Sequence, residues 1–239
     1  MPRDPTPESG AARYTRGVRE QGCVVVFTKP ALPGRVKTRL IGALSADQTA
    51  ELHQAFLDDL VSRLRPQPHA VWLAWALEEG EEAPPSDLPA LRQEGSDLGA
   101  RLFKALDAAS REFTRVAAVG SDHPELPAER VDEAFARLEG GADVVLGPAS
   151  DGGYYLIAVG RKGLRREVFQ GIEWSTESVL ASTIANCRSL GLAVALLEPG
   201  HDVDTPEDLP RLGAYLTQNP DSCPRTLDLF QLWGLTEAG

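Results

Sequence analysis

Short apolar runs alternate along this chain with longer segments in which apolar residues recur at helical spacing. Apolar runs that predict strands lie at residues 23–27, 70–77, 116–120, 143–147, 154–159 and 192–197. In the segments between several of these runs, apolar residues return every three or four positions, which is typical of helices with one buried face. Strands that alternate with helices predict an α/β fold with three layers, in which helices cover both faces of a mainly parallel central sheet.

The helical spacing is clearest in the segment that follows the first strand. Ser45 and Gln48 have the spacing of a capping box, which predicts that a helix begins there. Its buried face would consist of Leu52, Phe56, Leu60 and Leu64. Asp97 predicts the start of a second helix, which would run from 98 to about 113, and Pro127 predicts the start of a third. Ser175 predicts the start of a fourth.

The composition is that of a globular protein, and the length suits one α/β domain better than two small ones. The chain has 239 residues, of which 42% are hydrophobic and 25% are charged. Residues 1–21 are rich in Pro, Gly, Arg and Glu and show no periodicity, so we expect a mobile tail followed by a single domain at 22–239. No apolar stretch approaches the roughly 20 residues that span a bilayer. The first residues also lack the apolar core of a secretory signal.

Charge and cysteine content narrow the class of partner. The formal net charge of -11 and the sequence pI of about 4.9 argue against a nucleic acid as the main partner. The 3 cysteines are odd in number and have no CxxC spacing, which argues against a disulfide framework or a zinc cluster. These features favour a reducing compartment, so we expect a cytoplasmic protein.

Basic residues gather in the loop directly after the first strand. They are Lys29, Arg35, Lys37 and Arg39. Pro33 and Gly34 make the turn between them, and Gly34 allows a close approach of the backbone. A nucleotide triphosphatase loop would need Gly before Lys37-Thr38, and Val36 stands there instead. In so acidic a chain, a local group of cations favours a phosphate-binding loop over a solvated basic turn.

Acidic residues follow two later strands. Ser121 and Asp122 end the strand at 116–120, and a carboxylate there could hold Mg²⁺ or form an ordinary turn before Pro124. Asp202 and Asp204 alternate in an extended segment, so both side chains would face the same way. Such a pair repels unless a cation lies between the two carboxylates. We therefore expect a metal site formed by Asp122, Asp202 and Asp204, although Asp204 could instead cap a helix.

Further motifs have either a binding or a purely structural reading. Asp151, Gly152 and Gly153 form a glycine-rich turn whose backbone could approach a substrate. Trp174, Ser175 and Thr176 would stand at the start of a helix, a position that binds anions. The remaining candidates, near the start of the second helix, are Asp97, Gly99 and Arg101. A plain turn and two ordinary helix caps are the structural alternatives.

The order of these motifs resembles a bacterial family of GT-A-type transferases whose members are labelled as glycosyltransferases or nucleotidyltransferases. The motifs are Phe27-Thr28-Lys29-Pro30, Pro33-Gly34-Arg35-Val36-Lys37-Thr38-Arg39-Leu40, Asp97-Leu98-Gly99-Ala100-Arg101, Gly120-Ser121-Asp122-His123-Pro124, Gly147-Pro148, Asp151-Gly152-Gly153-Tyr154-Tyr155, Trp174-Ser175-Thr176 and Asp202-Val203-Asp204-Thr205-Pro206-Glu207-Asp208. The resemblance covers about residues 23–216. More distantly, the chain is similar to the 2-phospholactate and molybdenum-cofactor guanylyltransferases.

This resemblance implies the nucleotide-diphospho-sugar transferase fold, which is Rossmann-like. It implies that Lys37 and Arg35 face nucleotide phosphates, and that Asp122 binds the metal together with Asp202 or Asp204. It also implies that the turn at 152–153 borders an acceptor pocket. The molybdenum-cofactor enzymes have a longer glycine-rich loop in place of Lys29-Pro30, so the base preference does not carry over.

Three functions remain open on this reading. The first is a Mg²⁺- or Mn²⁺-dependent nucleotidyltransferase that joins the NMP part of an NTP to a small phosphorylated acceptor, with Lys37, Arg35 and Asp122 as the catalytic groups. The second is a glycosyltransferase that uses an NDP-sugar. The third is a non-catalytic nucleotide-binding module. The basic loop favours the first, because a triphosphate carries more negative charge than an NDP-sugar. No residue pattern selects the base, the sugar, the acceptor or an oligomeric state.

Overall fold

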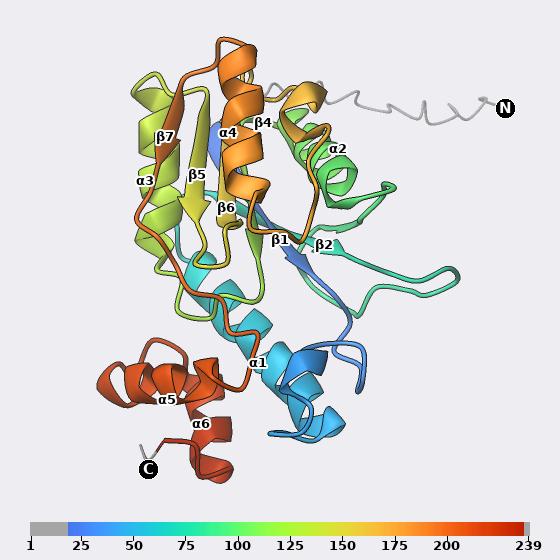
Figure 1. The fold of residues 1–239 in the computed structure, drawn as a ribbon, viewed down its shortest axis with the longest axis vertical. Coiled ribbons are helices and arrows are strands. Elements are labelled where there is room, and N and C mark those ends of the chain that lie inside the picture. The colour runs from blue at the N-terminus through green and yellow to red at the C-terminus, as the bar shows by residue number, and fades with distance from the viewer. Residues whose placement is uncertain (1–18, 237–239) are drawn as a thin grey trace, which may run out of the picture.

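A seven-stranded sheet forms the centre of the protein, in a computed structural model that describes residues 19–236 (Figure 1). Its strands are β1 (Arg19–Thr28), β2 (Ala70–Trp75), β3 (Ala90–Arg92), β4 (Phe113–Gly120), β5 (Val144–Pro148), β6 (Tyr154–Gly160) and β7 (Val194–Leu196). Their order in the sheet is β3-β2-β1-β4-β6-β5-β7. All neighbouring strands are parallel except where β6 pairs antiparallel with β4 and β5. The predicted mainly parallel sheet is therefore confirmed.

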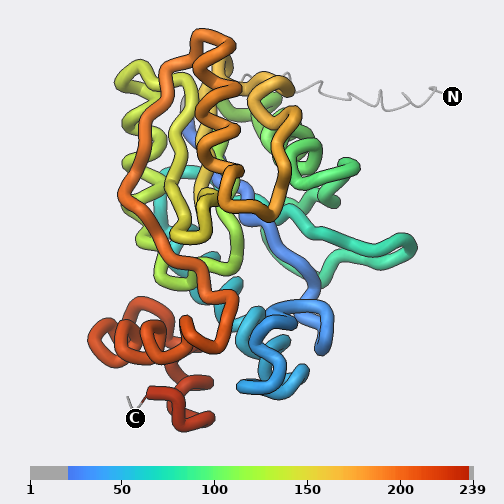
Figure 2. The backbone as a smooth tube through the Cα atoms, in the orientation of Figure 1, coloured from blue at the N-terminus to red at the C-terminus, as the bar shows by residue number. Residues whose placement is uncertain are grey.

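Helices cover both faces of the sheet. They are α1 (Ala46–Leu64), α2 (Leu98–Ser110), α3 (Ala128–Glu139), α4 (Val179–Ser189), α5 (Asp208–Gln218) and α6 (Pro224–Leu232), with 3-10 turns η1 (Thr38–Leu40) and η2 (Arg166–Phe169). α1 and α3 pack on one face, and α2 and α4 on the other. The tube in Figure 2 shows that α5 and α6 lie beyond this sandwich, at the end where the basic loop follows β1. No helix within residues 19–236 has the length and hydropathy needed to span a bilayer.

Residues 23–27 of the first strand are all apolar because helices lie against both of its faces. Val24 and Val26 face the cluster with α1 and α3, whereas Cys23 and Val25 face the cluster with α2. A third apolar cluster joins the first half of α1 to α5 and α6, and it includes the fully buried Val203. This third cluster fixes the acidic segment around Val203 to the start of α1.

The predicted helix starts at Ser45 and Asp97 are confirmed. Ser45 Oγ accepts from Gln48 N at 3.1 Å, and Gln48 Oε1 accepts from Ser45 N at 2.8 Å, which completes the capping box. Asp97 Oδ1 accepts from Ala100 N at 2.8 Å. The predicted inner face of α1 is fully buried, as shown by Leu52, Phe56, Leu60 and Leu64.

Several predicted boundaries were wrong. β1 begins at Arg19, so residues 19–21 belong to the sheet and not to the predicted tail, while residues 1–18 lie outside the described part of the chain. α2 ends at Ser110 because Phe113 begins β4. β3 was not predicted, because its three residues are mostly exposed and have no apolar period.

Ser175 does not cap a helix. α4 begins at Val179, and Ser175 has a left-handed backbone with φ of 66°. The segment before α4 is a turn in which Thr176 Oγ1 donates to Glu173 O at 2.7 Å. The Thr176 hydroxyl therefore stabilises a turn that precedes the helix, and the capping prediction failed because turns and caps favour the same residue types.

Candidate functional site

A cleft of about 450 Å³ lies at the carboxyl ends of the parallel strands. Phe27, Thr28 and Lys29 line it from the end of β1, and residues 120–122 line it from the end of β4. Ala76 follows β2 and Gln93 follows β3, so four neighbouring parallel strands contribute to one cleft. This is the position at which open α/β sheets bind their ligands.

The cleft brings together basic and acidic residues from motifs that are far apart in the sequence. The predicted site residues that line it are Lys29, Arg35, Lys37, Arg39, Arg101, Ser121, Asp122 and Asp204. The basic residues come from the loop after β1 and from α2, and the acidic residues come from the loop after β4 and the segment before α5. The cleft therefore has cations and carboxylates in one space of nucleotide size.

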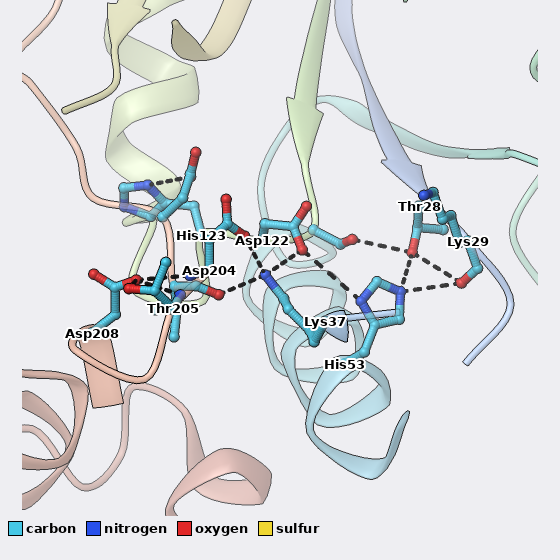
Figure 3. Close-up of polar contacts among 12 residues, drawn as sticks. Thr28, Lys29, Lys37, His53, Asp122, His123, Asp204, Thr205 and Asp208 are labelled. Carbon is cyan, nitrogen blue, oxygen red and sulfur yellow. Dashed lines mark hydrogen bonds and ion pairs between the residues drawn. The ribbon is translucent and has the colours of Figure 1, made fainter. Parts of the chain in front are cut away.

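Lys37 lies between the two carboxylates (Figure 3). Its Nζ is 2.5 Å from Asp122 Oδ1 and 3.1 Å from Asp204 Oδ1, and it donates to Val203 O at 2.7 Å. The Lys37 side chain is 2% exposed, whereas the side chains of Asp122 and Asp204 are 48% and 41% exposed. An ammonium group has three donors, and here all three have acceptors.

The charges of this group are coupled. Burial favours the neutral form of Lys37, but the carboxylates of Asp122 and Asp204 outweigh it and raise the Lys37 pKa. Burial opposes ionisation of Asp122, yet the Lys37 ammonium holds the Asp122 pKa below its usual range. Burial raises the Asp204 pKa, and the neighbouring Asp122 adds to this effect while Lys37 opposes it. One cation thus serves two carboxylates.

Backbone contacts hold the loops of the group together. Ser121 N donates to Phe27 O at 3.1 Å, and Val203 N donates to Asp122 O at 3.0 Å. Lys37 itself has a left-handed backbone with φ of 48° and ψ of 37°, which is uncommon for a residue other than Gly. The left-handed residue of this turn is thus Lys37 itself, while the preceding Val36 is buried.

Arg35 is also engaged within the protein. Its guanidinium donates to the two carboxylate oxygens of Glu81 at 2.9 Å and 3.1 Å and lies 3.0 Å from Glu78. Among residues 19–236, neither Lys29 nor Arg39 has an ion-pair partner, and both are exposed. Arg101 makes a long contact to Gly95 O at 3.5 Å. The uncommitted positive charge of the cleft thus comes from Lys29, Arg39 and Arg101.

The structure adds His53 and Gln93 to the cleft. His53 Nε2 is 3.1 Å from both Thr28 Oγ1 and Lys29 O, and since a carbonyl only accepts, Nε2 carries a proton. His53 Nδ1 lies 4.0 Å from Asp122 Oδ1, and burial lowers the His53 pKa. Gln93 donates to Ala74 O at 2.8 Å. The sequence did not predict that these two residues line the cleft. The position of His53 depends on how α1 packs against β1, and Gln93 follows β3, which was not predicted.

Other predicted site residues lie outside this cleft. They are Pro33, Gly34, Asp97, Gly99, Asp151, Gly152, Gly153, Trp174, Ser175, Thr176 and Asp202. Asp97, Gly99 and Trp174 line a separate cavity of about 160 Å³. Asp202 lies 3.6 Å from His123 Nδ1, so Asp202 and Asp204 have different partners.

Two of the glycines in these motifs approach the protein's own chain. A Cβ added to Gly99 would lie 2.6 Å from Trp174 Cζ2 and from Phe169 O. At Gly152, where φ is 87°, an added Cβ would overlap the backbone of Glu177. These two glycines are therefore explained by packing between loops.

A divalent metal fits Asp122 and Asp204 only together with other ligands. Within residues 19–236, no three His, Cys, Asp or Glu side chains are arranged to hold a metal on their own. Mg²⁺ commonly binds through one or two carboxylates and takes its remaining ligands from substrate phosphates and water. Both carboxylates are partly exposed in the cleft, so their chemistry suits a metal that arrives with a phosphate chain.

Comparison with known proteins identifies the fold and the class. A protein from Desulfovibrio desulfuricans G20, provisionally described as a nucleotide-diphospho-sugar transferase, is 30% identical, and the match covers 91% of this chain and 97% of that one with a TM-score of 0.81. This relative confirms the predicted fold and the predicted enzyme class, a transferase. No curated protein matches the chain.

More distant structures share the fold alone. A cytidylyltransferase from Leptospira borgpetersenii serovar Hardjo-bovis is 12% identical with a TM-score of 0.54 over 90% of this chain and 94% of that one. The 2-C-methyl-D-erythritol 4-phosphate cytidylyltransferase from Thermus thermophilus is 19% identical with a TM-score of 0.51, and the match covers 83% of this chain and 99% of that one.

A family model described as "Uncharacterized protein conserved in bacteria (DUF2064)" matches residues 57–176, and the chain belongs to this family.

Proposed function

We propose that this protein is a nucleotide-dependent transferase whose cleft binds the phosphate chain of a nucleotide. One observation carries the proposal: the cleft at the carboxyl ends of β1 to β4 has uncommitted cations and partly exposed carboxylates around the same space. Lys29, Arg39 and Arg101 would bind phosphate oxygens. A free basic residue serves this role better than Arg35, whose guanidinium is already paired with Glu81.

The reaction that suits this cleft best is nucleotidyl transfer from an NTP to a small phosphorylated acceptor. An acceptor oxygen would form a bond to the α-phosphorus, and the bond from that phosphorus to the bridging oxygen would break and release pyrophosphate. The cations of the cleft would stabilise the charge that develops on the phosphates, and positioning would supply much of the rate.

A divalent metal, Mg²⁺ or Mn²⁺, would supply further positive charge to the phosphates from Asp122 and Asp204. Lys37 would keep these two carboxylates close together, since its ammonium contacts both of them. Asp204→Ala should therefore raise the metal concentration that gives half of the maximal rate. Unchanged metal dependence in this variant would remove Asp204 from the metal site.

The second candidate is a glycosyltransferase with an NDP-sugar donor. It is favoured by the Desulfovibrio relative, whose provisional description is a nucleotide-diphospho-sugar transferase. In that reaction the acceptor would attack the sugar carbon, and the nucleoside diphosphate would leave. The same cations would then stabilise the diphosphate.

Turnover assays separate these functions. The full chain would be incubated with each NTP, Mg²⁺ and a panel of small phosphorylated acceptors, and pyrophosphate would be measured. Acceptor-dependent pyrophosphate release supports nucleotidyl transfer. Release of nucleoside diphosphate from an NDP-sugar supports glycosyl transfer instead. Thermal stabilisation by nucleotides without turnover of either donor class would contradict both reactions and favour the non-catalytic module.

A further inference from the structure

We propose that Lys37 is the resident counter-ion of the metal position, so that divalent metal binds Asp122 and Asp204 only when a nucleotide accompanies it. The inference rests on the proposed nucleotide-transfer function and assigns Lys37 a role other than phosphate binding in the resting protein. Lys37 would be a positioning residue, because it acts through the two carboxylates.

The contacts of Lys37 place its charge where a metal would have to bind. Its Nζ contacts Oδ1 of Asp122 at 2.5 Å and Oδ1 of Asp204 at 3.1 Å, and it donates its remaining hydrogen bond to the carbonyl of Val203. Figure 3 shows the ammonium between the two carboxylates, with His53 on the far side of Asp122. A metal held by Asp122 and Asp204 would therefore meet a fixed positive charge.

The backbone of the basic loop is shaped to deliver this side chain. Lys37 adopts a left-handed conformation that costs a residue with a Cβ about 1 kcal/mol. Its side chain is 2% exposed and passes the ring of Phe56, with Nζ 5.5 Å from the ring centroid. If Lys37 bound only phosphate, nothing in the nucleotide-free protein would offset the cost of this strain and burial. The contacts with the two carboxylates offset that cost.

Electrostatics then favour lysine over free metal in the absence of nucleotide. Two carboxylates near one ammonium leave a net charge of one negative unit. If a divalent ion took the place of the ammonium between them, the buried Lys37 would keep its charge with no carboxylate beside it and only the Val203 carbonyl as an acceptor. The phosphates of a nucleotide would supply new acceptors for the ammonium. Metal and nucleotide binding would consequently be coupled.

The test is a Mn²⁺ titration of the full chain without nucleotide, with free Mn²⁺ measured by electron paramagnetic resonance. The variant Lys37→Met removes the ammonium and keeps a long side chain that can remain against Phe56. Its Mn²⁺ affinity should be about tenfold higher than that of the native protein, or more, because two carboxylates lose their shared cation. Lys29→Met is the matched control, since it removes one positive charge from the same cleft without touching either carboxylate, and it should change the affinity by less than about threefold.

Thermal unfolding supplies a second readout. Lys37→Met should unfold at a lower temperature than the native protein, and Mn²⁺ should restore much of the loss, whereas Mn²⁺ alone should leave the native protein unchanged. If Lys37→Met does not fold, Lys37→Gln takes its place, because its amide can still donate to Val203 O.

An equal or lower Mn²⁺ affinity in the folded Lys37 variant would overturn the inference, as would an effect of the same size in Lys29→Met. Neither result would bear on the proposed function, which is measured by turnover of nucleotides. Conversely, a protein that transfers no nucleotide but gains Mn²⁺ affinity in Lys37→Met would support the counter-ion role and contradict the proposed reaction.

Discussion

Asp59 of α1 should be among the residues that matter most for stability. Its side chain is fully buried, and its carboxylate caps the start of α6. Oδ2 accepts from Thr226 N at 2.9 Å and from Thr226 Oγ1 at 2.8 Å, while Oδ1 accepts from Arg225 N at 3.2 Å. Asp59→Ala would leave two backbone N–H groups and one hydroxyl without this acceptor.

The expected cost follows from these three donors and from the ion pair between Asp59 Oδ1 and Arg225 Nη1 at 3.5 Å. Removing one side of a buried charged network destabilises proteins by about 3 to 5 kcal/mol, and we expect Asp59→Ala to fall in this range. Urea denaturation monitored by circular dichroism measures the change in the free energy of unfolding. Asp58→Ala is the matched control, since Asp58 lies next in the same helix, is partly exposed and accepts from Gln54 Nε2. We expect the control to cost less than about 1 kcal/mol. Equal losses in the two variants would refute the capping argument.

Two further predictions concern stability. Gly152→Ala should cost about 2 kcal/mol or more, because the new Cβ would overlap the backbone of Glu177 at a φ of 87°. The control Gly191→Ala has open space around the new Cβ at a φ of 66° and should cost about 1 kcal/mol. Similar losses of unfolding free energy for the two variants in urea denaturation would contradict the packing role of Gly152. Burial holds the pKa of His69 below 6.5 although Asp132 opposes it, so the unfolded chain binds the proton first and stability should fall as pH decreases below about 6.5. His69→Gln should reduce that loss between pH about 7.5 and about 5.5, and an unchanged pH slope would contradict the argument.

The sequence predicts the fold and the place of the site because both depend on local patterns. Apolar runs at 23–27 and 116–120 indicate buried strands, and parallel strands end at the same edge of a sheet. The basic loop follows the first run and Asp122 follows the second, and both line one cleft. Helix capping by Ser45 and Asp97 was also predictable from local sequence, because each side chain accepts a hydrogen bond from the backbone N–H three residues later.

The sequence does not predict which charged groups pair within the cleft. The contact between Lys37 and Asp204 joins residues 167 positions apart, and the pairing of Arg35 with Glu81 depends on the path of an irregular loop. Glycine poses a similar problem. Gly152 allows a close approach, but only the packed structure shows that the approaching backbone is that of Glu177 and not that of a ligand.

Nucleotide binding tests the central claim most directly. Isothermal titration calorimetry of the full chain with nucleotides and NDP-sugars in the presence of Mg²⁺ should show saturable binding of at least one of them. Arg39→Ala should weaken that binding by about tenfold to a hundredfold, because a hydrogen bond between ionised groups is lost. Arg188→Ala, which removes an exposed arginine of α4 outside the cleft, should leave it unchanged. Binding that is absent for every nucleotide, or equally weakened by both substitutions, would contradict the account.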